Sequence, residues 1–208
     1  VVGGVTGSSI TFGGSSYVTV GSGISGSTLT GAAGTDTFLI GSTASSSSIT
    51  MGDTGANILR ITGAIGNTTI TGGTGNDSVT AAESNVDTIS FSTGADTLSV
   101  VGGVTGSSIT FGGSSYATIG ENLTGSTLTG AAGTDTFLIG GAVTASSITL
   151  GDTGANILRI TGAVGGATIT GGTGNDSVTA GDSDVDTISF STGADTLSVV
   201  GAVTGSSI

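Results

Sequence analysis

The sequence predicts an all-β fold: a parallel β-solenoid with about 20 residues per coil and five coils in each 99-residue repeat. Residues 1–99 align without gaps on residues 100–198, with 81 identities in 99 positions. Within each repeat, a hydroxyl–aliphatic–hydroxyl triplet returns at steps of 19, 20, 21, 19 and 20 residues. The 42 glycines and the alternating β-branched residues favour short strands joined by turns over helices.

Each triplet is predicted to be the first strand of a coil. A Gly-rich loop, a second strand and a second Gly-rich turn then complete the coil. The triplets of the first repeat are Ser9–Thr11, Thr28–Thr30, Ser48–Thr50, Thr69–Thr71 and Thr88–Ser90. The same cycle restarts at Ser108–Thr110, so the chain is predicted to form one continuous solenoid. Residues 1–99 are its first unit, residues 100–198 its second, and residues 199–208 the start of a third. We expect such units to belong to a longer tandem array or to stack end to end.

Alternation along the strands predicts which side chains point inward. The predicted inward set is Phe38, Ile40, Leu59, Ile61, Ile70, Val79, Ala81, Leu98 and Val100, with Ile24, Ala44, Ile65, Val86 and Val104 at the second turns. A single hairpin cannot bury these groups, whereas stacked coils give each group a partner above and below. We also expect Phe12, Phe38 and Phe91 to lie in or near this core. The pattern fits a flat two-sheet β-roll and a flattened or triangular β-helix equally well.

The composition excludes several classes of function. The chain has no Cys, His or Lys, only two Arg and 14 carboxylates, for a net charge of −12. It therefore has no thiol or imidazole for catalysis or soft-metal binding, and it is unsuited to binding nucleic acid through phosphates. No apolar run approaches the roughly 18 residues of a transmembrane segment. Because each candidate acid simply recurs with the repeat, we expect no enzymatic activity.

The loop after the first strand contains the most informative motif. Residues 72–80, GGTGNDSVT, match the nonapeptide G-G-x-G-x-D-x-U-x at every specified position, and residues 171–179 repeat them. Residues 31–38, 52–59 and 93–98 carry weaker versions. These loops resemble those of the RTX family of secreted bacterial proteins, whose parallel β-rolls bind calcium.

The resemblance implies Ca²⁺ between stacked loops, which together offer the roughly six to eight oxygen ligands that this ion prefers. The candidate ligands are Asp36, Asp53, Asn57, Asp77, Asp96, Asp135, Asp152, Asn156, Asp176 and Asp195. The best-charged neighbours are Asp77 with Asp96 and Asp176 with Asp195, whereas Asp53 and Asp152 would compensate for Asn57 and Asn156. The alternative is a metal-free ladder, in which these side chains cap turns by accepting backbone N–H groups.

Other residues outside the core allow two interpretations each. Glu83, Asp87, Asp182, Asp184 and Asp186 are predicted to form a solvated acidic edge, or else a weak cation site. Arg60 and Arg159 should point outward, either in ion pairs with a neighbouring coil or in contact with an acidic neighbouring molecule. Tyr17 and Tyr116 are predicted to stand where the column of loop acids is interrupted, either covering a metal-free edge or offering a platform for a sugar.

The combined features predict a structural protein of the bacterial cell surface or extracellular space, a building block of a surface layer or filament that self-associates into a fibre or lattice. A polysaccharide or cell-envelope anchor would lie outside this segment. The alternative is a spacer or binding module of a calcium-dependent adhesin, a class that includes ice-binding proteins. Thr35, Ala56, Asn76 and Ala95 follow the loop glycines and do not form the uniform Thr/Asx array that ice binding at this edge would need.

Overall fold

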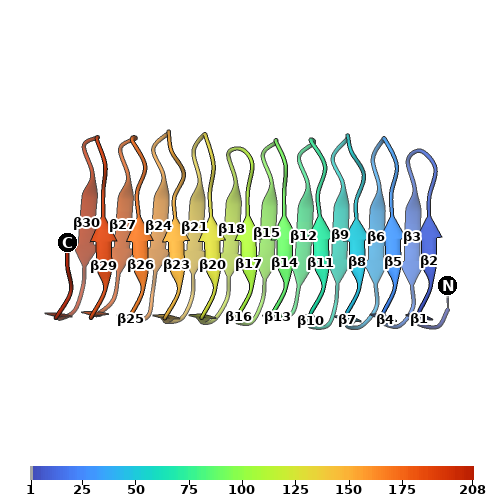
Figure 1. Ribbon diagram of the computed structural model, residues 1–208, viewed down its shortest axis with the longest axis horizontal. Coiled ribbons are helices and arrows are strands. Elements are labelled where there is room, and N and C mark those ends of the chain that lie inside the picture. The colour runs from blue at the N-terminus through green and yellow to red at the C-terminus, as the bar shows by residue number, and fades with distance from the viewer. Residues whose placement is uncertain (1) are drawn as a thin grey trace.

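The computed structural model describes residues 2–208 and shows a rod of stacked coils (Figure 1). Three parallel sheets run along the rod, and these residues contain no helix. Each complete coil supplies a two-residue strand to sheet A, a three-residue strand to sheet B and a four-residue strand to sheet C. The predicted all-β parallel solenoid is therefore confirmed, with about 20 residues between equivalent strands.

The strands follow one another in the order A, B, C along the chain. Sheet A contains β1 (Val5–Thr6), β4 (Ile24–Ser25), β7 (Ala44–Ser45), β10 (Ile65–Gly66), β13 (Ser84–Asn85), β16 (Val104–Thr105), β19 (Leu123–Thr124), β22 (Val143–Thr144), β25 (Val164–Gly165), β28 (Ser183–Asp184) and β31 (Val203–Thr204). Sheet B contains β2 (Ser9–Thr11), β5 (Thr28–Thr30), β8 (Ser48–Thr50), β11 (Thr69–Thr71), β14 (Thr88–Ser90), β17 (Ser108–Thr110), β20 (Thr127–Thr129), β23 (Ser147–Thr149), β26 (Thr168–Thr170) and β29 (Thr187–Ser189). Sheet C contains β3 (Tyr17–Val20), β6 (Thr37–Ile40), β9 (Ile58–Ile61), β12 (Ser78–Ala81), β15 (Thr97–Val100), β18 (Tyr116–Ile119), β21 (Thr136–Ile139), β24 (Ile157–Ile160), β27 (Ser177–Ala180) and β30 (Thr196–Val199).

The short sheet A resolves the cross-section that the sequence left open. In Figure 1 the Gly-rich loops form the upper edge of the rod, and sheet A lies along the lower edge. We call these the loop edge and the turn edge. Because sheet A strands have only two residues, sheets B and C form the two broad faces and the solenoid is flattened.

The core is a set of straight columns of apolar side chains. Ile70 pairs with Ile49 and Ile89 in sheet B, and these three residues are fully buried. Burying one such side chain contributes about 1.5–3 kcal/mol. Phenylalanine rings extend the stacking, with centroids of Phe91 and Phe111 5.0 Å apart and those of Phe111 and Phe137 5.7 Å apart.

The junction between the two 99-residue units is built like any other coil contact. Strand β15 spans the junction, since Val100 begins the second unit, and it pairs residue for residue with β18 of the second unit, from Thr97↔Tyr116 to Val100↔Ile119. Strands β11 and β14, both within the first unit, pair in the same parallel manner. The repeat therefore adds length along the axis without a break in any of the three sheets.

One predicted core residue is on the surface. Val86 is 60% exposed, and its φ of 57° lies in the left-handed region. Ser84 takes the inward position instead, because it pairs in register with Ile65 and Val104. Its hydroxyl is satisfied by Asp87 Oδ2 at 2.9 Å and Ser107 Oγ at 3.1 Å, so a polar residue is accommodated in the core wall. The prediction for Val86 was wrong because the turn places the inward residue two positions earlier.

Candidate functional site

The residue just before each sheet C strand forms a column along the loop edge, which we call the loop column. Its members are Ser16, Asp36, Asn57, Asp77, Asp96, Ser115, Asp135, Asn156, Asp176 and Asp195. Each Asp or Asn accepts the backbone N–H of the column residue in the preceding coil, at N···O distances from 2.7 to 3.2 Å. The column thus links successive coils through side chains, where the loops leave the sheet ladders and their N–H groups need other acceptors.

The two full nonapeptides hold the best-satisfied carboxylates. Asp77 Oδ1 accepts N–H groups from the Asn57 backbone and side chain at 3.0 and 2.9 Å, and Oδ2 accepts the Gly73 N–H at 2.8 Å. Asp176 repeats these contacts with Asn156 and Gly172. Asp77 and Asp176 are each only 1% exposed, so the amide donors replace water around a buried anion. The adjacent asparagines continue the column, because Oδ1 of Asn57 accepts the Asp36 N–H and Oδ1 of Asn156 accepts the Asp135 N–H.

Three other carboxylates of the loop column are incompletely paired. The Oδ2 atoms of Asp36, Asp96 and Asp135 are buried and have no hydrogen-bond partner. Burial raises the pKa of Asp96 from 3.8 to about 6, and the negative charge of the Asp77 carboxylate adds to the rise. The hydrogen bond from the Asp77 N–H lowers the pKa but does not offset these effects. Burial likewise raises the pKa of Asp135 from 3.8 to about 6, although the Ser115 N–H, which donates to Oδ1, and the nearby Ala131 N–H, which makes no hydrogen bond to this carboxyl group, lower it. These carboxyl groups are therefore short of hydrogen-bond donors or of a cation.

The fit of a calcium ion differs along the loop column. Within residues 2–208, no group of three or more acidic residues converges on one point. The unpaired Oδ2 atoms are nevertheless hard, buried oxygens of the kind that Ca²⁺ prefers. At Asp77 and Asp176 both oxygens already accept N–H groups. The donor set therefore fits a cation at Asp36, Asp96 and Asp135 better than at the two full motifs.

The remaining predicted site residues lie elsewhere or at the end of the column. Asp53 and Asp152 are exposed on the loop edge, and their backbone carbonyls accept the N–H groups of Thr74 and Thr173 at 2.9 Å. Asp195 is partly exposed, and its Oδ1 accepts the Asp176 N–H at 2.9 Å.

The predicted position of the two tyrosines in the loop column was wrong. Ser16 and Ser115, not Tyr17 and Tyr116, occupy the loop column in the acid-free loops. Their neighbours Tyr17 and Tyr116 begin sheet C strands and point outward, with 72% and 44% of their surface exposed. The loop of this coil is one residue shorter, which made the alignment of the motif misleading.

A second ladder runs along the turn edge, and sequence reasoning missed it. The residue before each sheet B strand forms this turn column, which includes Ser27, Ser47, Thr68, Asp87, Ser107, Ser126, Ser146 and Asp186. The Ser27, Ser107 and Ser126 N–H groups, for example, donate to the hydroxyl one coil further on at 3.1 to 3.2 Å. A small hydroxyl residue precedes most of the triplets, with Asp87, Ala167 and Asp186 as the exceptions, and this regularity was the available signal.

Two residues of the predicted acidic edge belong to this turn column. Asp87 and Asp186 are each only 2% exposed, whereas Glu83, Asp182 and Asp184 are exposed. Asp87 accepts the Thr68 N–H at 2.8 Å, the Ser84 hydroxyl at 2.9 Å and the Asn85 N–H at 2.8 Å. Burial raises the pKa of Asp87 despite these three hydrogen bonds. The prediction of a solvated face was therefore wrong for Asp87 and Asp186.

The pKa values of Asp96 and Asp135 predict that the metal-free protein loses stability as pH rises from about 4 to 6. The folded state holds these protons to a pKa of about 6, whereas the unfolded chain releases them near 3.8. The free energy of unfolding should therefore fall through this window, by on the order of 2 kcal/mol for each carboxyl. Urea unfolding in chelator at pH 4.5 and 7.5 measures the difference.

The double variant Asp96→Asn/Asp135→Asn should remove most of this pH dependence and be more stable than the unchanged protein at pH 7.5. Asn57 and Asn156 already occupy equivalent positions, so the amide fits the column. The matched control is Asp53→Asn/Asp152→Asn, which changes two exposed acids and should leave the profile unaltered. If the free energy of unfolding of Asp96→Asn/Asp135→Asn still falls steeply between about pH 4 and 6, the pH dependence does not come from Asp96 and Asp135.

Comparison with known proteins adds no family to this description, since no family model, curated protein or solved structure matches the chain. Residues 2–208 also include no helix with the length and hydrophobicity to cross a membrane.

Proposed function

We propose that the protein is a structural building block of an extracellular assembly, a bacterial surface layer or filament, in which the repeat sets the length of a stiff rod. The observation that carries this proposal is the unbroken pairing of β15 with β18 across the junction of the two units. The contact between the two units is the same as the contact between coils within a unit. Repeats of this kind can therefore be added to lengthen the rod, which suits a structural role. The acidic, cysteine-free composition is compatible with the cell surface or extracellular space.

We further propose that Ca²⁺ rigidifies the rod at the loop edge. Its support is the set of buried, unpaired Oδ2 atoms of Asp36, Asp96 and Asp135, together with the resemblance of the loops to calcium-binding nonapeptides. Bound Ca²⁺ would supply the positive charge that these carboxylates lack.

Chelation at pH 7.5 is therefore expected to lower the melting temperature. A ligand that binds only the folded state contributes about 2.7 kcal/mol at 100 times its dissociation constant. The triple variant Asp36→Asn/Asp96→Asn/Asp135→Asn should lose the response to calcium while keeping the hydrogen-bond ladder. An unchanged melting curve of the original protein, after confirmed metal removal, contradicts the calcium proposal and leaves the ladder metal-free.

Electron microscopy of the native assembly, with and without chelator, tests the structural role. We expect filaments or a lattice with an axial repeat of about 24 Å, because five coils stack at about 4.8 Å each. Native material consisting of separate short rods would contradict the proposal.

The second candidate function is that of an adhesin segment, and one feature of sheet B favours it. All the outward positions of β2, β5, β8, β11, β14, β17, β20, β23, β26 and β29 are Ser or Thr. This flat, uncharged face suits hydrogen bonding to a hydroxylated ligand. Separate rods in the native material would favour this function over the surface-layer role.

A further inference from the structure

The outward face of sheet C carries the only two cations of this chain. Arg60 lies in β9 and Arg159 in β24, and both side chains are exposed. They are 99 residues apart, which corresponds to five coils and to about 24 Å along the rod. Because the chain has a net charge of −12, an acidic partner would be attracted most strongly at these two arginines.

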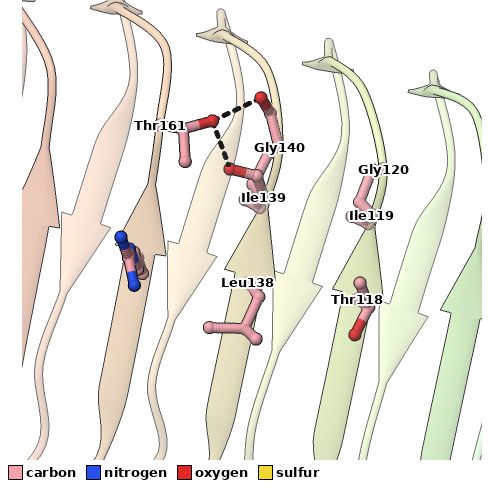
Figure 2. Close-up of a pocket in the computed structure, with 8 residues that line it drawn as sticks. Thr118, Ile119, Gly120, Leu138, Ile139, Gly140 and Thr161 are labelled. Carbon is pink, nitrogen blue, oxygen red and sulfur yellow. Dashed lines mark hydrogen bonds between the residues drawn. The ribbon is translucent and has the colours of Figure 1, made fainter.

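Each arginine lies beside a shallow apolar groove. One groove, of about 260 Å³, is lined by Thr118, Leu138, Arg159 and Thr161 with the ends of β18 and β21 (Figure 2). Its counterpart one unit earlier, of about 330 Å³, is lined by Thr19, Leu39, Arg60 and Thr62. Each site therefore combines apolar walls with a positive charge.

The guanidinium groups have no partner among the residues that the structure describes. Among residues 2–208, neither Arg60 nor Arg159 makes an ion pair or a side-chain hydrogen bond. The ion pairs with a neighbouring coil that the sequence suggested are therefore absent from the described part of the chain. A carboxylate from outside the rod would meet an arginine that is free to pair.

The turn edge carries a complementary feature with the same period. Val86 and Val185 project from the turns with 60% and 66% of their surface exposed. Both have a φ of 57°, which is unfavourable for a β-branched residue and turns these apolar side chains outward. Exposed acids precede them, Glu83 in the first unit and Asp182 in the second. Each turn therefore combines an apolar knob with a negative charge.

We propose that these two surfaces bind each other between copies of this chain, with Val86 and Val185 of one rod in the grooves of the next and Glu83 and Asp182 facing Arg60 and Arg159. Both surfaces recur at 99 residues, so two contacts form together along neighbouring rods. The contact joins two different surfaces, and such heterologous contacts produce open arrays. This inference rests on the proposed structural function and describes how rods pack sideways.

A mixing experiment with charge-reversed rods tests the contact. Arg60→Glu/Arg159→Glu and Glu83→Arg/Asp182→Arg rods should each lose lateral association at low salt, by at least about tenfold in the association constant. An equimolar mixture of the two should recover it, as measured by sedimentation velocity and electron microscopy. All four positions are exposed, so circular dichroism should show unchanged folding.

Two further variants separate the contact from general charge effects. Asp53→Arg/Asp152→Arg matches the turn-edge reversal in charge, lies on the opposite edge and should leave lateral association intact. Val86→Gly/Val185→Gly relieves the left-handed backbone, so it should weaken lateral association without loss of stability. The inference is overturned if the equimolar mixture of charge-reversed rods stays dissociated. It is also overturned if Asp53→Arg/Asp152→Arg weakens lateral association as much as Glu83→Arg/Asp182→Arg does. Long filaments that never pack sideways would overturn it too and leave the proposed structural function standing.

Discussion

Replacing Gly75 with alanine is expected to disrupt the coils around residues 65–81 and to lower the free energy of unfolding by more than about 3 kcal/mol. A Cβ atom at this position would overlap the backbone carbonyl oxygen of Gly55 in the preceding coil. The overlapped atom belongs to the backbone, so no side-chain rotation can relieve the clash. The stacked loops approach one another so closely that only glycine fits.

Gly66→Ala is the matched control, because it lies in the same coil at the opposite edge. A Cβ atom there would meet only the Asn85 carbonyl oxygen, at 3.7 Å, which is an ordinary contact. We expect a change within about 0.5 kcal/mol for this surface substitution. Urea unfolding gives both values, and hydrogen exchange of the 55–61 and 97–100 segments locates the damage. Equal stability of the two variants would mean that the loops are spaced more widely than described.

Asp77→Ala should have the second-largest effect, a loss of about 3 kcal/mol or more, even in the absence of calcium. The substitution leaves three buried donors without an acceptor: the Asn57 N–H, the Asn57 side-chain amide and the Gly73 N–H. Each buried unsatisfied donor costs about 1–3 kcal/mol. The effect should spread to the preceding coil, because two of the three donors belong to Asn57.

Glu83→Ala is the control for Asp77→Ala, since it also removes one acid but from an exposed position, and it should change stability by less than about 0.5 kcal/mol. Asp77→Asn should fall between the two, because its NH₂ group would face either the Asn57 or the Gly73 N–H. Measuring all three variants in chelator separates the hydrogen-bond ladder from any metal. An Asp77→Ala protein as stable as Glu83→Ala would show that the ladder contributes nothing.

The coil plan was predictable because it depends on features that repeat. The triplets centred on Ile49, Ile70 and Ile89 mark both the strands and their inward residues, and the structure pairs these three residues side by side. The loop acids were also located correctly, since each follows its glycines at a constant distance.

The burial and pairing of individual acids were not predictable from spacing. Asp87 and Glu83 look alike as acids of one turn, but a left-handed residue at Val86 turns Asp87 inward while Glu83 stays in solvent. The sequence also does not reveal that the Oδ2 atoms of Asp77 and Asp96 differ in their hydrogen bonding. The Gly73 N–H donates to Asp77 Oδ2, whereas Asp96 Oδ2 has no hydrogen-bond partner; Ser92 and Thr93 stand where the full motif has its glycine pair. Such effects depend on backbone geometry in three dimensions.

The parallel pairing of every strand with its counterpart one coil away has a mechanical consequence. The hydrogen bonds of sheets A, B and C run along the rod, as do those of the loop and turn columns. A pulling force applied to the two ends therefore acts on one coil boundary at a time and peels coils from the ends in succession. Each released coil of about 20 residues would extend to roughly 65 Å from a stacked height near 5 Å. The rod would thus resist compression and bending, whereas under tension it would unfold one coil at a time and lengthen in steps.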